Sequence, residues 1–134
     1  DAGVYSSYWW NYRLEPYIRN TQILVCPSDS SLDCGYGYNY RHLRNNASTG
    51  AGISIAEIER PAERYVLMDG LAHCVYCVFC WPNQAAQGPN GNNWYIRARH
   101  NEGANVNFMD GHAKWLSNST IVNWSDSSRI AWGH

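Results

Sequence analysis

The chain has 134 residues, a formal net charge of −1 and a single lysine among its ten lysine and arginine residues. This length suits one globular domain, residues 1–134, and the charge excludes the basic surface that nucleic-acid binding needs. The longest apolar runs, such as VYCVFCW, are too short to cross a bilayer. We therefore expect neither nucleic acid nor a membrane as a partner of the chain as given.

Aromatic and turn-forming residues dominate the composition, with seven Trp, ten Tyr and eleven Gly beside only 16% charged residues. Such residues are typical of strands, turns and of secreted binding or assembly surfaces, although they also fill small β-rich cores. Five cysteines in a short chain favour an oxidising compartment. We expect an extracellular or cell-surface protein.

The first half of the chain is predicted to hold short elements. Residues 9–25 show a helix-like spacing of apolar side chains that Pro16 interrupts, and a strand is expected at 22–25. Residues 26–43 are rich in Pro, Ser, Asp and Gly and predict an ordered loop. Ser54, with Glu57 three residues on, has the spacing of a helix N-cap and predicts a short helix that ends before Pro61.

The second half predicts most of the sheet. Strands are expected at 64–69 (RYVLMD), 73–81 (HCVYCVFCW) and 94–99, and a hairpin at 103–116 turns at Asp110-Gly111. We expect a type I′ turn there, which needs positive φ at both central residues. The tail after the hairpin is expected to add a strand or to wrap the surface. The predicted fold is α+β, with short helices packed on an antiparallel β-sheet.

Four segments in this order carry a family resemblance: LEPYIRNTQILVCPSD, GYGYNY, ISIAEIERPAERYVLMD and RHNEGANVNFMDGHAKWL. Together they resemble the globular part of bacterial prepilin-like, pseudopilin-related proteins named after a signature of His, nine residues and Asp-Gly. The signature positions here are His100, Asp110 and Gly111. The resemblance implies a pilin-like globular head and a hydrophobic N-terminal helix, which is absent from this sequence.

The resemblance also implies a function without catalysis: a structural subunit of an extracellular bacterial filament or tube. Each copy would repeat one surface contact with the next, so that the chain forms a helical homopolymer. Without the N-terminal helix, these contacts must come from sheet edges, aromatic patches or cysteines. The tryptophans in loops or near the termini are the candidate interface residues, namely Trp9, Trp10, Trp94, Trp124 and Trp132.

Two other functions stay open. Exposed Trp and Tyr side chains also suit a secreted carbohydrate-binding module that stacks on glycans. A metal-dependent enzyme would use His100 and Asp110, with His112 nearby. Asp110 and His112 flank a tight turn and are expected to point apart, so we favour a structural role for the signature.

Cofactors are not expected, and calcium is the one alternative. Pseudopilins of the type II secretion group, which this chain resembles, often hold calcium in a C-terminal loop. The candidate carboxylates are Asp69 and Asp110, and beyond them Asp29 and Asp33. No run has the dense Asp and Asn pattern of a calcium loop, so solvated turn carboxylates are favoured.

The cysteines have two interpretations. Cys74, Cys77 and Cys80 stand at two successive C-x-x-C spacings, which zinc or an iron–sulfur cluster would suit if the segment turned. In a strand, Cys74 and Cys80 lie about 20 Å apart, so the three cannot share one ion. Disulfides to Cys26 and Cys34, with one thiol left for a neighbouring chain, fit better, and metal binding stays the alternative.

Overall fold

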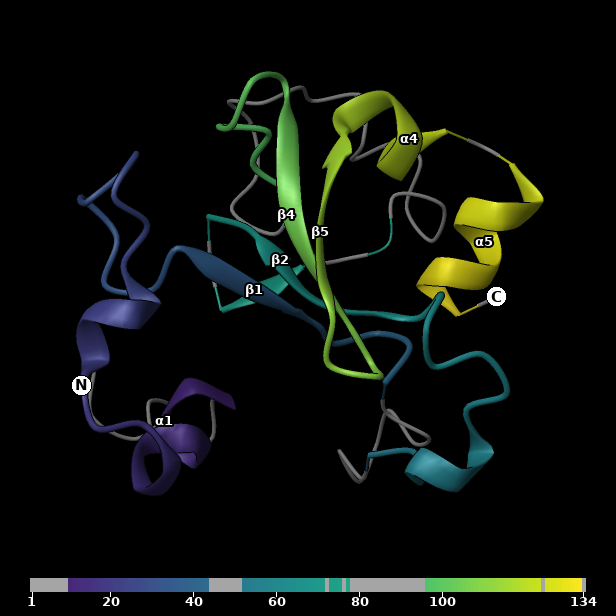
Figure 1. The fold of residues 1–134 in the computed structure, drawn as a ribbon, viewed down its shortest axis with the longest axis horizontal. Coiled ribbons are helices and arrows are strands. Elements are labelled where there is room, and N and C mark those ends of the chain that lie inside the picture. The colour runs from purple at the N-terminus through teal and green to yellow at the C-terminus, as the bar shows by residue number, and fades with distance from the viewer. Residues whose placement is uncertain are drawn as a thin grey trace.

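The computed structural model describes residues 10–43, 52–71, 73–75, 77, 96–123 and 125–133. Five strands form one sheet, and short helices flank it (Figure 1). The fold is therefore α+β, as predicted. In chain order the elements are α1 (Trp10–Leu14), the 3-10 helices η2 (Glu15–Tyr17) and η3 (Thr21–Leu24), β1 (Tyr36–Asn39), the 3-10 helix η4 (Ile55–Glu57), β2 (Tyr65–Asp69), β3 (Cys74–Val75), β4 (Gly103–Phe108), β5 (Ala113–Ser117), α4 (Asn118–Val122) and α5 (Asp126–Trp132).

The strands follow the order β3-β1-β2-β4-β5, and every pair is antiparallel except β1 with β3. The predicted antiparallel sheet is wrong at this one edge. β2 has β1 on one side and β4 on the other, so β3 pairs with the outer edge of β1. β2 runs antiparallel to β1, and the chain reverses direction between β2 and β3. β3 therefore lies parallel to β1, with Tyr38 opposite Cys74.

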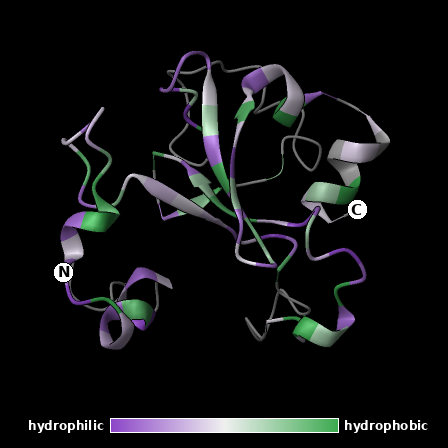
Figure 2. Ribbon diagram, in the orientation of Figure 1, coloured by the Kyte–Doolittle hydropathy of each residue, from purple (hydrophilic) through white to green (hydrophobic). Residues whose placement is uncertain are grey.

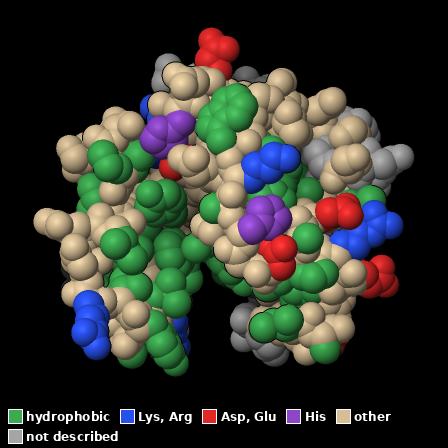
Figure 3. All heavy atoms as spheres, viewed as in Figure 1, with side chains coloured by type: hydrophobic (Ala, Val, Ile, Leu, Met, Phe, Trp, Pro, Cys, Tyr) green, Lys and Arg blue, Asp and Glu red, His purple; other side chains and the backbone are tan. Residues whose placement is uncertain are grey.

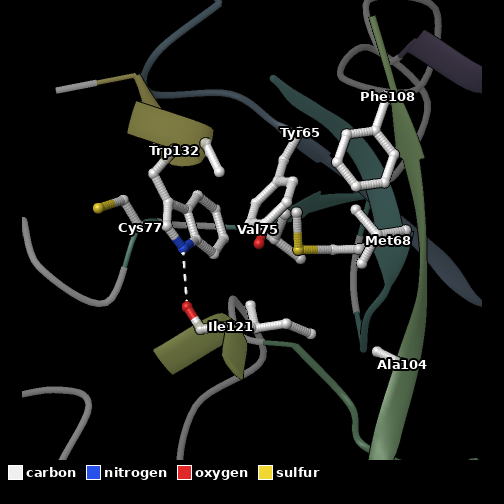
Figure 4. Packing of buried hydrophobic residues seen from close by; sticks show 10 residues of the cluster. Tyr65, Met68, Val75, Cys77, Ala104, Phe108, Ile121 and Trp132 are labelled. Atoms are coloured by element: carbon white, nitrogen blue, oxygen red, sulfur yellow. Dashed lines mark hydrogen bonds between the residues drawn. The ribbon is translucent and has the colours of Figure 1, made fainter. Parts of the chain in front are cut away.

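The core lies between the sheet and the two C-terminal helices. Alternate residues of β4 are buried, namely Ala104, Val106 and Phe108, as expected for a strand with one face against the core. Met68 and Tyr65 of β2 join them, and the edge of the Tyr65 ring meets Phe108 (Figure 4). Figure 2 shows hydrophobic residues on β2, β4 and α5, where these elements face one another.

The tail forms helices, and the expected strand or surface wrap is wrong. The Ser117 side chain accepts the Thr120 N–H and caps α4. Trp132 at the end of α5 is fully buried, and its indole N–H donates to the Ile121 carbonyl at 3.1 Å (Figure 4). The Trp132 side chain therefore belongs to the core, and the prediction that it lies at an interface is wrong.

Two N-terminal predictions need correction. The expected strand at 22–25 is the 3-10 helix η3, because the Asn20 side chain accepts the Gln22 N–H and caps a turn there. The expected loop at 26–43 contains β1, which lies inside the sheet. Asn39, fully buried on β1, donates to the carbonyls of Tyr65 and Trp132 and so joins the strand to β2 and α5.

Several other predicted elements agree in place. β2 and β4 lie within the expected strands, β5 ends one residue beyond the expected 116, and Ser54 caps η4 by accepting the Ala56 N–H at 3.3 Å. Of the expected strand at 73–81, β3 is the part that forms among the described residues, and 76 and 78–81 lie outside them. Of the expected strand at 94–99, Ile96 makes an isolated bridge to Gly70, and residues 97–99 are irregular. Among the described residues, no helix has the length and apolar character that a membrane span requires.

Candidate functional site

The signature residues lie at opposite ends of one strand. His100 comes just before β4, and Asp110 comes just after it. A strand of this length spans about 20 Å at ~3.3 Å per residue. The structure therefore does not bring His100 and Asp110 together, and a catalytic site that combines them has no geometric basis.

The Asp110 end is an exposed hairpin turn. The hairpin prediction is confirmed, but the type I′ turn is wrong, because only Gly111 has positive φ, at 95°. The N–H of Gly111 donates to the Phe108 carbonyl, and the N–H of Phe108 donates to the His112 carbonyl. This pattern is a three-residue loop with one left-handed residue, which glycine supplies.

Asp110 and His112 contact one another, contrary to the prediction that they point apart. Asp110 Oδ1 lies 2.6 Å from His112 Nδ1 and also accepts the His112 backbone N–H at 3.2 Å. These hydrogen bonds, the backbone one first, lower the pKa of Asp110 below its ordinary value. The His112 ring stacks on Phe108. Both polar side chains are well exposed, and their hydrogen bonds are made to each other.

The His100 end has the tighter turn. His100 and Gly103 exchange two backbone hydrogen bonds of 3.1 Å, and Asn101 and Glu102 between them have φ of 51° and 58°. Both central residues are therefore left-handed, as in the type I′ geometry that was expected at Asp110-Gly111. The Trp115 indole N–H donates to the His100 carbonyl at 2.7 Å and fixes this end of β4 against β5.

Cys26 reaches the same place from the N-terminal half of the chain. It opens the turn Cys26-Pro27-Ser28-Asp29, in which the Asp29 N–H donates to the Cys26 carbonyl at 3.0 Å. Proline fits the second position of such a turn. Gly35 passes close by: a Cβ there would lie 2.7 Å from the Cys26 Cβ. The backbone of Gly35 also accepts the Gly70 N–H, so this glycine lets Cys26 approach the end of β2.

Asp69, the last residue of β2, lies at the same place as Cys26 and His100. It is fully buried, and its Oδ2 accepts the Asn105 N–H at 2.6 Å. Its backbone carbonyl accepts the Arg97 N–H. Its other carboxylate oxygen, Oδ1, is buried with no hydrogen-bond partner. Buried polar atoms without a partner are rare in folded proteins because desolvation is costly.

The side chains of Cys26, Asp69 and His100 converge on one point, and we call these three residues the cluster. His100 Nε2 lies 3.4 Å from Cys26 Sγ and 3.5 Å from Asp69 Oδ1, and all three atoms lie within 4.8 Å of one another. A Cys–His–Asp catalytic relay needs the two ring nitrogens to face different partners. Here the same nitrogen faces both, so the arrangement is that of ligands around a centre.

Arg99 holds the surrounding segments together. Its guanidinium donates from Nη2 to the Gly70 carbonyl at 2.5 Å, and its Nη1 lies 3.7 Å from Asp29 Oδ2. The turn at Cys26 and the end of β2 are thereby fixed to the residue next to His100. The same environment affects Tyr36. Burial raises the pKa of the Tyr36 phenol most, and the charges of Asp69 and Cys26 raise it further.

The other predicted site residues, apart from Cys26, lie elsewhere. Cys26 and Cys34 are free thiols, whereas the sequence prediction placed both in disulfides. Cys34 donates from Sγ to the Tyr36 carbonyl at 3.3 Å, and burial raises the pKa of its thiol. Cys74 is buried on β3, and Cys77 is buried in the hydrophobic core. Cys80 lies outside the described residues, as do Trp9, Trp94 and Trp124.

Sequence reasoning found the three members of the cluster separately and did not combine them. Asp69 was a calcium candidate, His100 a signature residue, and Cys26 a disulfide candidate. Each comes from a different segment of the family resemblance, namely VCPSD, YVLMD and RHNEG. The coincidence of one ligand-type residue in each of these segments was the available signal.

An exposed apolar surface forms a second candidate site. Seven large hydrophobic side chains are exposed in the described residues, and four of them lie within α1, η2 and η3. We call these four, Tyr12, Leu14, Tyr17 and Ile23, the N-terminal apolar surface. Figure 3 shows hydrophobic side chains gathered over this part of the molecule, at the lower left. Trp10 lies beside it and donates to the His73 carbonyl at 2.6 Å, which holds α1 against the sheet.

Comparisons of the chain with protein-family models, with curated proteins and with solved structures found no match.

Proposed function

We propose that the chain is a structural subunit of an extracellular filament or tube, in which copies contact one another through their globular surfaces. The observation that carries this proposal is the N-terminal apolar surface. Tyr17 is 83% exposed and Ile23 is 58% exposed. Exposed apolar side chains that gather on one face are typical of protein–protein contacts. The segment LEPYIRNTQILV, which holds Tyr17 and Ile23, is also part of the family resemblance.

A second copy of the chain is the partner that the charge supports. The net charge of −1 gives little electrostatic repulsion between copies. The N-terminal apolar surface meets a different surface of the next copy, and a contact of this kind repeats without closing and produces a helical polymer.

The β5 edge of the sheet is less suited to the contact. β5 is an edge strand, but Lys114 lies within it, and a charged residue on an edge strand opposes pairing with another strand. Trp115 beside it uses its indole N–H within the same chain. The N-terminal apolar surface therefore carries the assembly in this proposal.

The test is electron microscopy and sedimentation of the protein from its source organism, with variants made there. Tyr17→Ser combined with Ile23→Ser removes the two most exposed side chains of the N-terminal apolar surface. Ile55→Ser is the matched control, since Ile55 is 74% exposed but lies on η4 (Figure 1). We expect ordered polymers from the wild type and the control, and a large loss of polymer in the double variant.

Two outcomes would contradict the proposal. Uniform particles of the monomer mass in the wild type would remove the assembly function altogether. Retention of such monomers on insoluble glycans would favour the carbohydrate-binding alternative, for which Tyr17 and Trp115 are exposed rings in different parts of the fold. A non-reducing gel of the same samples tests whether cysteines join the copies.

A further inference from the structure

We propose that Cys26, Asp69 and His100 together bind one divalent transition-metal ion of the zinc class. The ion would join three segments: the turn after η3, the end of β2 and the turn before β4. This inference does not depend on the proposed assembly, because the three ligands lie within one chain.

The two donor separations that involve His100 fit a tetrahedral ion. Zinc bonds of about 2.3 Å to sulfur and about 2.0–2.1 Å to nitrogen or oxygen place neighbouring donors about 3.3–3.6 Å apart. His100 Nε2 lies 3.4 Å from Cys26 Sγ and 3.5 Å from Asp69 Oδ1. His100 is therefore already at binding distance from both partners, and Cys26 Sγ and Asp69 Oδ1 lie within 4.8 Å of one another.

The unpartnered oxygen of Asp69 points to the same conclusion. Asp69 Oδ1 faces His100 Nε2, at a distance too long for a hydrogen bond. The other oxygen, Oδ2, is held by the Asn105 N–H, which fixes the orientation of the carboxylate. Metal-binding carboxylates are commonly oriented by such a second hydrogen bond. A metal ion would supply the partner that the buried Oδ1 lacks.

The donor types select the ion. Thiolate, imidazole and carboxylate together suit zinc and related transition metals, whereas calcium and magnesium take oxygen donors.

Solvent has access to one side of the cluster. The His100 side chain is 25% exposed, whereas Asp69 is fully buried. Three protein ligands leave one tetrahedral position for water or a small ligand. The ion would therefore enter along the His100 side and keep an exchangeable ligand there.

The experiment loads the untagged, chelator-treated chain with Co²⁺, and then measures Zn²⁺ affinity by competition with a chromophoric chelator. We expect one equivalent of metal and a thiolate-to-cobalt charge-transfer band. Cys26→Ser should lose the band. Asp69→Asn and His100→Gln should each weaken Zn²⁺ binding by about tenfold or more. At the same Zn²⁺ concentration, the ion should raise the unfolding temperature of the wild type more than that of Asp69→Asn.

Matched controls come from residues of the same types. Cys34→Ser removes another buried thiol, and Asp110→Asn alters the other Asp–His contact. Both should bind metal like the wild type. A wild type without the charge-transfer band, or a band that survives Cys26→Ser, would overturn the proposal. Unchanged affinity in Asp69→Asn would also overturn it. If Asp69→Asn does not fold, Cys26→Ser still decides, because its band is read directly.

Discussion

Each end of β4 places a histidine beside an aspartate, in two different environments. At the Asp110 end, the two side chains lie 2.6 Å apart with 43% of the His112 and 37% of the Asp110 side chain exposed. At the His100 end, the corresponding separation from Asp69 is 3.5 Å, and the Asp69 side chain is fully buried. A cysteine sulfur joins the second pair and not the first.

The Asp110–His112 pair has the shorter contact but is the weaker candidate for a ligand site. Asp110 and His112 satisfy one another in solvent, where an exposed ion pair contributes little to stability. Asp69 and His100 lie 3.5 Å apart, and one carboxylate oxygen is left without a hydrogen-bond partner. A buried acceptor that the fold fixes but does not satisfy is the better indication of a missing ligand.

The largest difference in stability between the two ends of β4 is expected when the glycine at each end is replaced by alanine. A Cβ at Gly103 would overlap the Trp115 ring and lie 2.5 Å from the Leu116 carbonyl oxygen. Gly103→Ala should therefore lower the free energy of unfolding by about 3 kcal/mol through overpacking. Gly111→Ala meets no atom within 4 Å and should cost only about 1 kcal/mol, from its positive φ. Urea denaturation measures both, and equal losses would contradict the close contact of Trp115 with Gly103.

The two aspartates provide a smaller contrast. In the presence of a chelator, Asp69→Ala leaves the Asn105 N–H without its acceptor. Loss of such a partner from a buried group costs about 2 kcal/mol. Asp110→Ala removes an exposed carboxylate and should change the unfolding midpoint less. A midpoint for Asp69→Ala at or above that of Asp110→Ala would show that the Asp69 carboxylate does not support this end of β4.

The smallest effect is a dependence on pH at the exposed end. The His112 backbone N–H, and then its ring, lower the pKa of Asp110 below the ordinary value of 3.8. The unfolded chain therefore takes up this proton first as the pH falls. The stability from the ionised carboxylate is present above pH 3.8 and is lost as the pH falls through the lower, folded value.

Urea midpoints of the wild type and Asp110→Asn, compared from about pH 5 down to about pH 2, measure this contribution. The wild type should be the more stable protein at the higher pH, and the two should converge at the lower. Added salt should reduce the difference. A difference that stays constant across this range would mean that the Asp110 charge contributes nothing.

Local patterns in the sequence predicted local structure well. The alternation of buried residues in β4, the Asp110-Gly111 turn and the cap at Ser54 depend on neighbours in the chain. The sequence did not predict features that depend on contacts between distant parts of the chain. The loop-like composition around β1 concealed a strand whose buried Asn39 is held by Tyr65 and Trp132, and those contacts become available only in the folded chain.

The cluster was hard to predict for the same reason. Cys26, Asp69 and His100 are far apart in sequence, and each had a sufficient local explanation in a turn, a strand end or a hairpin. Two contacts bring the segments together: the backbone of Gly35 passes close to Cys26, and the Arg99 guanidinium donates to the Gly70 carbonyl. Neither contact produces a periodic pattern in the sequence. The exposure of Tyr17 and the burial of Trp132 likewise depend on how η2 and α5 pack.

The most direct test of the metal site at the His100 end is zinc-edge X-ray absorption of the zinc-loaded chain. We predict one sulfur ligand at about 2.3 Å and nitrogen or oxygen ligands at about 2.0–2.2 Å. The sulfur contribution should vanish in Cys26→Ser and persist in Cys34→Ser. A zinc shell of nitrogen and oxygen alone in the wild type would contradict the assignment of Cys26, Asp69 and His100 as ligands of one ion.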